Sequence, residues 1–586
     1  MIDWNGACIA ALWIAGLAVL LATLSHARWL SGAQGLRLGA VLSTPDFSLA
    51  CDLGLALFSL GLCLSARPLW QRVAWGLLAV LYAALALSET RKPRRAPLET
   101  PRAALAPLDP PQAAAAAGNQ AGGACRLRVL QPWKRRLASI LQRFELWWAL
   151  AALPLLLLPG RHSALALAAI ALWWALRSVA WGRTGLRTPH DAPVALLLCM
   201  LPVTLWASAD VTMTLPALYQ LIAGVALFYA LANWATTPQR LATATTLWVL
   251  GGAGLAALGP LAATNWGTAK FFNALPVLTR VHAYVKPLWM EDINANVLGA
   301  GLAALWPLTA ALLPAPLGAS PWKATLARLG LAGASLAMAA LLLLTQSRGA
   351  LLALAGALAF MGLLRWPWLR WLGLLAAVAL ALWLWRAGAP SLQRWGEWLS
   401  SGGTLTSLAG RQEVWSRALY MTQDFPFSGI GLGTFDLVQP LLYPFFLSAG
   451  LVHHAHNLFL QVAVDLGLPG LIAYLALWLG CFHGTWQAYR ALSAPRNPIS
   501  ETNPSSEHAP PWLSSLALGL LGSQTAMTLH GLLDTPVWSN KLAFLPWFAF
   551  GLSAALWKWV TTANGRANGL TDIANQEASV SPFRVR

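Results

Sequence analysis

The sequence predicts an all-α fold, a polytopic membrane bundle of about fifteen transmembrane helices within a range of about 12–15. Apolar residues make up 57% of the 586-residue chain and charged residues only 10%, and the mean hydropathy is +0.57. Apolar runs of about twenty residues, long enough to cross a bilayer as helices, recur along the chain. A water-soluble globular core needs no such runs, so that class of protein is excluded.

Fifteen apolar runs are the predicted spans. The first run, in "MIDWNGACIAALWIAGLAVLLATL", lacks the basic segment and the small-residue cleavage site of a signal peptide, so it is kept as a helix. The spans are expected near residues 7–24, 48–66, 70–88, 146–159, 162–180, 192–208, 214–232, 241–263, 294–314, 324–345, 350–364, 370–386, 456–480, 513–533 and 542–560.

The domain organisation follows from a basic segment, residues 89–143, which is rich in Pro and Ala and carries eleven Lys and Arg. Lys and Arg concentrate on the cytoplasmic side of membrane proteins, so this segment is predicted to be a disordered cytoplasmic linker. It separates three extra helices in residues 1–88 from a twelve-helix domain in residues 146–562. Alternation of the spans places the tail, residues 563–586, in the cytoplasm as well.

The net charge of +18 is interpreted as a topology signal and as an attraction for anionic lipid headgroups. No motif for nucleic acid accompanies it. The six cysteines all fall within spans or the linker, so no disulfide framework is predicted. No spacing typical of zinc ligands occurs, and the sequence supports no metal centre.

Two long loops on the predicted periplasmic side, residues 264–293 and 387–455, concentrate Arg and His where few basic residues are expected. For any single arginine, binding to lipid headgroups or snorkelling to the interface is an equally good explanation. The candidate cations in these loops and at the outer end of one span are Arg280, Arg411 and Arg348.

A helix that starts at His456 would carry two glycines on one face. At about 100° per residue, Gly467 lies about 20° around such a helix and Gly470 about 40° to the other side. Glycines let another helix approach closely, so this face is expected to be buried in the bundle, with His456 at its rim and aimed inward. An imidazole accepts a proton near neutral pH, which makes His456 the candidate general base. The plainer alternative is a histidine that caps the helix or satisfies a buried polar contact.

Other polar residues near His456 have their own predicted roles. Asn457 completes a His-Asn pair, and His454 is less favoured as the base because it precedes the helix. Asp534, in "HGLLDTP", lies just outside a span and could orient a histidine or an arginine, or form a cap or turn. Asp465 is expected about 13 Å below His456 on the opposite helix face, as a buried structural hydrogen-bonding group.

The spacing of His456-Asn457, nine residues and then Gly467-x-x-Gly470 resembles the signature of bacterial O-antigen ligases. These belong to a larger family with O-antigen polymerases and protein O-oligosaccharyltransferases. The segments "AGRQEVWSRALYMTQDFPFSGIGLGTF" (409–435), "SRGALLAL" (347–354) and "HGLLDTPVW" (530–538) add to the resemblance. It covers about 290–560, extends back to 146, and is absent from 1–143; Asp465 stands where relatives often carry Glu.

The resemblance implies a membrane glycosyltransferase of the bacterial inner membrane. It would take a glycan from undecaprenyl diphosphate on the periplasmic side and join it to an acceptor, which is lipid A–core in lipopolysaccharide ligases. Guanidinium groups are bidentate, permanently charged partners for phosphate oxygens, so Arg348, Arg411 and, more weakly, Arg280 are the candidate diphosphate ligands. Direct attack assisted by His456 would invert the anomeric carbon. Arginines would replace a metal ion, so no cofactor is expected.

Alternative functions remain open. An O-antigen polymerase or a protein O-oligosaccharyltransferase would use the same lipid-linked donor with a different acceptor. A flippase or transporter of lipid-linked glycans would show charged or broken helices near the middle of the bilayer, whereas here the polar residues gather at one face. The expected partners are the undecaprenyl-diphosphate-linked glycan donor, a lipid A–core, glycan or protein acceptor, and membrane lipids; nucleic acid is not among them.

Overall fold

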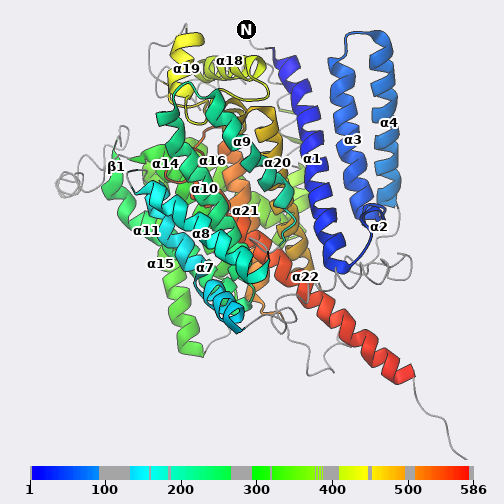
Figure 1. Ribbon diagram of the computed structural model, residues 1–586, viewed down its shortest axis with the longest axis vertical. Helices are drawn as coiled ribbons and strands as arrows, with labels where there is room; N and C mark the ends of the chain where they lie inside the picture. The colour runs from blue at the N-terminus through cyan, green and yellow to red at the C-terminus, as the bar shows by residue number, and fades with distance from the viewer. Residues whose placement is uncertain are drawn as a thin grey trace, which may run out of the picture.

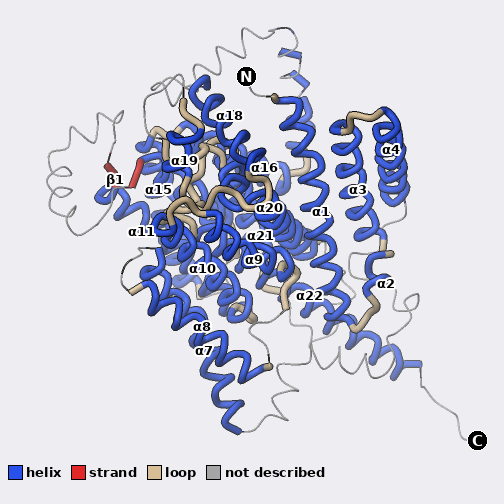
Figure 2. Tube along the Cα trace, turned by 45° about the horizontal axis from the view of Figure 1, so that its top comes forward, coloured by secondary structure: helices blue, strands red, loops and turns tan. Residues whose placement is uncertain are grey.

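The computed structural model shows a bundle of long helices with the N-terminal helices grouped on one side (Figures 1 and 2). It describes residues 3–91, 132–157, 160, 162–182, 187–264, 293–316, 320–375, 378, 379, 382, 383, 386, 408–445, 452–494 and 509–579.

The helices of the N-terminal part are α1 (Trp4–Gln34), α2 (Leu38–Leu42), α3 (Pro45–Ser65) and α4 (Leu69–Arg91). Those of the larger bundle are α7 (Pro132–Leu157), α8 (Ser163–Trp181), α9 (Asp191–Ala207), α10 (Val211–Trp234), α11 (Pro238–Ala262), α14 (Ala295–Leu312), α15 (Pro321–Thr345), α16 (Arg348–Arg365), α18 (Leu408–Asp424), α19 (Phe435–Leu442), α20 (Leu458–Ser493), α21 (Trp512–Gly531) and α22 (Phe544–Ser579).

The predicted fold class is confirmed. Fourteen of the fifteen predicted spans coincide with helices of the described residues, and the remaining one, 370–386, is described only in part. Within the described residues, eleven helices are long and apolar enough to cross a membrane, and α9 is a shorter apolar helix. Helix α21 is more polar than these eleven because it carries a buried glutamine, Gln524, whose amide donates to the Ser553 hydroxyl at 2.7 Å.

The N-terminal helices form a tight group, drawn in blue at the right of Figure 1. Helix α1 packs on α3, and α3 packs on α4. A Cβ atom at Gly16 would lie only 2.6 Å from the carbonyl oxygen of Gly54, so glycine is required where α1 crosses α3. Helix α1 also packs against α20 and α9, which joins this group to the larger bundle.

Among the eleven candidate spans, α10, α14 and α20 are the most buried, and they pack on α21 and α22 in the middle of the larger bundle. In their most apolar stretches, 72%, 78% and 72% of the residues are buried, against 22% in the peripheral helix α15. Two short strands, β1 (Ala263–Thr264) and β2 (Ile293–Asn294), pair in parallel with Ala263 opposite Ile293. This pair fixes the C-terminal end of α11 beside the N-terminal end of α14.

Two helix ends differ from the predicted domain boundaries. The linker expected over residues 89–143 ends earlier, because α7 begins at Pro132. Its first turns are amphipathic: Ala138 and Leu141 are buried, while the basic Arg136 is exposed, so this stretch packs as a helix. At the other end, the predicted cytoplasmic tail is helical through Ser579 as the continuation of α22.

The long loops are described in part. Of the loop predicted over 264–293, residues 265–292 lie outside the described residues, and Arg280 is among them. The loop predicted over 387–455 contains two helices, α18 and α19, which lie across the upper end of the bundle in Figure 1. Together with the segments that precede α20 and follow α21, these helices carry most of the predicted site.

Candidate active site

His456 does not belong to the helix that follows it, contrary to the prediction. Its φ is +46°, and α20 begins two residues later at Leu458, with Asn457 as the N-cap. The Asn457 side chain accepts a hydrogen bond from the Leu460 amide at 3.0 Å and donates one to the Leu532 carbonyl at 3.1 Å. Asn457 therefore caps the start of α20 and ties the histidine segment to the segment after α21.

Gly467 breaks α20, so the two signature glycines do not mark one face of a straight helix. Gly467 has φ +69° and ψ −178°, and the amide of Leu468 donates to the Pro426 carbonyl at 2.7 Å. A Cβ atom at Gly467 would lie 2.7 Å from the carbonyl carbon of Phe427, while one at Gly470 would lie 2.3 Å from the Cβ atom of Leu466. The backbone that packs closely against Gly467 is therefore the loop that follows α18. It is not a second helix, as the sequence had suggested.

The loop after α18 is held by the same break. The Ile430 amide donates to the Val464 carbonyl at 2.9 Å, and Gly429 lies so close to Asp465 that a Cβ atom would approach its carbonyl oxygen to 2.6 Å. The Asp465 side chain is fully buried and accepts hydrogen bonds from Gln461 at 2.9 Å and from the Trp538 indole at 2.8 Å. Its predicted structural role is therefore confirmed.

A cluster of two histidines and one aspartate lies just above the start of α20. Asp534 Oδ1 is 3.1 Å from His456 Nδ1 and 3.7 Å from His454 Nδ1, and the two imidazole rings are 4.3 Å apart. The three side chains are partly shielded: His456 is 25% exposed, His454 36% and Asp534 14%. The tertiary fold thus joins His456 to a residue 78 positions away in the sequence.

The charges of this cluster follow from its contacts. Burial alone would raise the pKa of Asp534, but the hydrogen bond from His456 and the nearby His454, His456 and His530 outweigh burial and hold this pKa below its ordinary value. Burial lowers the pKa of His454 to about 4, with a smaller opposing effect of Asp534 and a further lowering by neighbouring cations, including Arg411. At neutral pH, His454 is therefore uncharged beside an ionised Asp534.

The carboxylate also selects the tautomer of His456. A carboxylate only accepts hydrogen bonds, so Asp534 pairs with a protonated Nδ1, and the lone pair of His456 is then on Nε2. The Trp415 indole holds the backbone of the same residue by donating to the His456 carbonyl at 3.3 Å. This arrangement leaves an oriented nitrogen that can accept a proton.

Two of the three predicted arginines lie in the described part of the chain. Arg411, in the first turn of α18, is close enough to His454 and His530 to influence both electrostatically, and its buried Nε has no hydrogen-bond partner among the described residues. Arg348 is exposed at the first position of α16. Arg280 lies outside the described residues.

His530 is a site residue that the sequence analysis missed. It is 3% exposed, and its Nδ1 has no hydrogen-bond partner among the residues that the structure describes. A Cβ atom at Gly349 would lie 3.5 Å from its Nε2, so the imidazole sits against the first turn of α16, next to Arg348. Its carbonyl accepts from the Asp534 amide at 2.9 Å. The spacing of four residues between His530 and Asp534 was the available signal.

One group among the described residues could also hold a metal ion: His454, His456 and Asp534 each offer a ligand atom, and these atoms lie within 4.8 Å of one another. Two imidazole nitrogens and a carboxylate oxygen are a common donor set for zinc. The same three atoms equally fit a hydrogen-bonded cluster without metal.

Comparison with known proteins agrees with this geometry. The model of the O-antigen ligase family matches residues 333–475, a stretch that contains Arg348, Arg411, His456 and both signature glycines. Among curated proteins, none matches the chain at a significant level. Over these residues, the match confirms the resemblance inferred from the sequence. The chain is thus a multi-pass membrane protein in which residues 333–475 are similar to the O-antigen ligase family.

Proposed function

We propose that this protein is an inverting membrane glycosyltransferase that transfers an O-antigen-type glycan from undecaprenyl diphosphate to an acceptor, lipid A–core. The observation that carries the proposal is the His456–Asp534 pair at the end of the bundle, flanked by Arg411 and by His530 beside Arg348. An oriented base next to cations is the combination that attack on a sugar diphosphate requires.

The proposed step is a direct displacement at the anomeric carbon. The acceptor hydroxyl loses its proton to His456 Nε2, and its oxygen forms a bond to the anomeric carbon of the glycan. The bond from that carbon to the diphosphate oxygen breaks, and its electron pair stays on the leaving diphosphate. The guanidinium groups of Arg411 and Arg348 neutralise this charge, aided by the positive end of the α16 helix dipole. Asp534 stabilises the imidazolium that forms at His456.

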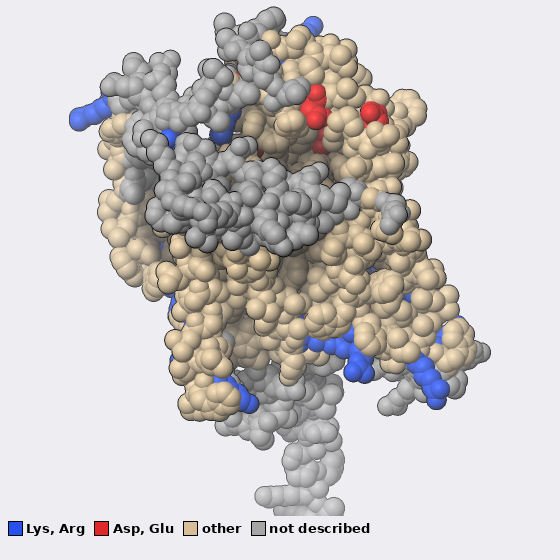
Figure 3. Space-filling model, turned by 90° about the vertical axis from the view of Figure 1, so that its left-hand side faces the viewer, with Lys and Arg blue, Asp and Glu red and all other residues tan. Residues whose placement is uncertain are grey.

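The charge distribution supports a periplasmic site in the bacterial inner membrane. On the face shown in Figure 3, Lys and Arg side chains line the lower end and a few others lie near the upper end, while the visible Asp and Glu side chains lie only toward the upper end, where α18 and α19 are found in Figure 1. Cytoplasmic ends of membrane proteins are enriched in Lys and Arg, so the lower end is assigned to the cytoplasm.

The test is transfer by purified protein in detergent, with a glycan on undecaprenyl diphosphate as donor and lipid A–core as acceptor. Mass spectrometry should detect the glycosylated lipid A–core. Replacing Arg348 or Arg411 by Ala should weaken binding of the donor as well as transfer, and Lys should restore binding only in part because it lacks the bidentate fork. Transfer to a pilin-like protein or to a second lipid-linked glycan, with none to lipid A–core, would overturn the assigned acceptor.

A further inference from the structure

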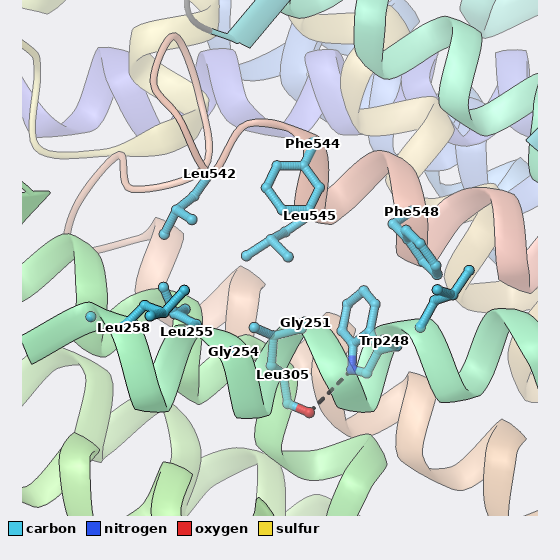
Figure 4. A pocket seen from close by; sticks show the side chains of 12 residues that line it. Trp248, Gly251, Gly254, Leu255, Leu258, Leu305, Leu542, Phe544, Leu545 and Phe548 are labelled. Carbon is cyan, nitrogen blue, oxygen red and sulfur yellow. Dashed lines mark hydrogen bonds between the residues drawn. The ribbon is translucent and has the colours of Figure 1, made fainter. Parts of the chain in front are cut away.

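A cavity of about 270 Å³ lies between α11, α14 and the start of α22. Figure 4 shows side chains from the start of α22 pointing across it toward α11. The residues that line it are Leu247, Trp248, Gly251, Gly254, Leu255, Leu258, Gly259, Leu305, Leu542, Phe544, Leu545 and Phe548. The only side-chain polar atom among them, the Trp248 indole nitrogen, already donates to the Leu305 carbonyl at 3.1 Å. A polar ligand would lose hydrogen bonds here, so the cavity suits a hydrocarbon.

Two glycines of α11 keep this space open. A Cβ atom at Gly251 or Gly254 would meet no atom within 4 Å, whereas one at Gly252 would lie 2.5 Å from the sulfur of Met338. Gly252 therefore serves packing against α15, and the other two face open space. Leu258, which is 49% exposed, lies at the edge of the cavity, so a chain could enter it from the side of the bundle.

Helix α14 separates this cavity from the first turn of α16. At Gly299, a Cβ atom would lie 2.8 Å from the Thr345 hydroxyl and 3.0 Å from Ser347, the residue before Arg348. At Gly301, it would instead lie 2.8 Å from Leu542, in the cavity wall. Helices rise about 1.5 Å per residue, so Leu305, the residue of α14 that lines the cavity, lies about 9 Å further along α14 than Gly299.

The cavity is therefore about one helix diameter, roughly 10 Å, to the side of the turn that carries Arg348, and slightly deeper in the bundle. It also shares a segment with the site, because Leu542 follows Asp534 in the connection between α21 and α22. A lipid whose phosphates lie at the arginines would reach this cavity with the part of its chain next to the headgroup.

We propose that the cavity binds the first isoprene units of the polyprenyl chain of the lipid-linked donor. The assignment rests on the function proposed above, which places a diphosphate at Arg348 and Arg411. The volume is below the range of about 300–1,000 Å³ typical of pockets that enclose a whole small ligand, so the rest of the chain stays in the bilayer. Gripping the chain beside the headgroup would set the depth of the anomeric carbon relative to His456.

The test separates chain binding from headgroup binding. Gly254→Leu fills the cavity from a position where the new side chain meets open space, and Gly251→Leu does so from one turn earlier. Gly330→Leu is the matched control, because a Cβ atom at Gly330 also meets nothing within 4 Å but lies on α15 away from the cavity. Binding of tritiated undecaprenyl diphosphate is measured with each variant in detergent, together with its displacement by inorganic diphosphate.

We expect Gly254→Leu and Gly251→Leu to weaken undecaprenyl diphosphate binding about tenfold. Inorganic diphosphate should inhibit these variants at the same concentrations as it inhibits the wild type, and Gly330→Leu should match the wild type in both measurements.

Unchanged undecaprenyl diphosphate binding in both cavity variants would overturn the inference. An equal loss of affinity for undecaprenyl diphosphate and for inorganic diphosphate would also overturn it, because it indicates a disturbed fold. A raised KM for lipid A–core with unchanged undecaprenyl diphosphate binding would assign the cavity to the acceptor instead. If the wild type binds undecaprenyl diphosphate but transfers no glycan, the proposed function fails while this binding result stands.

Discussion

Replacing Asp534 by Asn tests whether the carboxylate contributes to transfer through its charge. The substitution keeps the size of the side chain and an oxygen that can accept from the Thr535 amide, which now donates to Asp534 Oδ1 at 2.9 Å. It removes the negative charge 3.1 Å from His456 Nδ1. The imidazolium that forms when His456 takes a proton would then lose its counter-charge.

The expected magnitude follows from this distance. At 3.1 Å and an effective dielectric constant of about 20, a carboxylate and an imidazolium attract each other by about 5 kcal/mol. Both side chains are partly exposed, 14% for Asp534 and 25% for His456, so solvent screens part of this attraction. A remaining contribution of about 2–3 kcal/mol corresponds to a rate loss of roughly 10²-fold.

The assay is the rate of glycan transfer as a function of pH, together with binding of undecaprenyl diphosphate. The pKa of Asp534 is held below its ordinary value and that of His454 is about 4, so neither group changes charge between about pH 5 and 8. The rate loss of the Asp534→Asn variant should therefore persist across this pH range, while donor binding stays near the wild-type value.

Asp436→Asn is the matched control. Asp436 also pairs with a histidine, His453, at 3.3 Å, but His453 is 71% exposed and is not the proposed base. This variant should transfer glycan at the wild-type rate. An Asp534→Asn protein that keeps a rate within about threefold of the wild type would refute the role assigned to the carboxylate.

Three further outcomes are expected. His456→Ala should lower transfer by about 10²–10⁴-fold with donor binding retained, and His454→Ala should have a smaller effect; near-normal transfer by His456→Ala would remove the proposed base. Gly467→Ala, at φ +69° and against the loop of residues 425–433, should lower the thermal unfolding midpoint through a strain of about 1–3 kcal/mol, whereas Gly330→Ala should not, as followed by thermal denaturation in detergent. A chelator should leave transfer unchanged. If a chelator instead abolishes transfer and an added divalent cation restores it, the histidines and aspartate of the cluster bind a metal.

The sequence indicated which residue types the site uses, but their placement depended on local conformations that no pattern records. The prediction of a straight helix, with His456 at its rim and two glycines on one face, follows from regular periodicity. The chain departs from that periodicity at His456, which takes a left-handed conformation, and at Gly467, which interrupts α20. Both departures are stabilised by distant partners, the Leu532 carbonyl through Asn457 and the Pro426 carbonyl through Leu468.

The sequence by itself determined the membrane-spanning helices. A long run of apolar residues is driven out of water in any fold, and in the bilayer it must pair its own backbone N–H and C=O groups by forming a helix. It also determined the family, through short-range spacings within one segment. Only the tertiary structure brought Asp534 to His456, His530 to the first turn of α16, and the glycines of α11 to Leu542. These contacts join segments that are far apart in the chain, and which helix faces meet is decided by side-chain packing across the whole bundle.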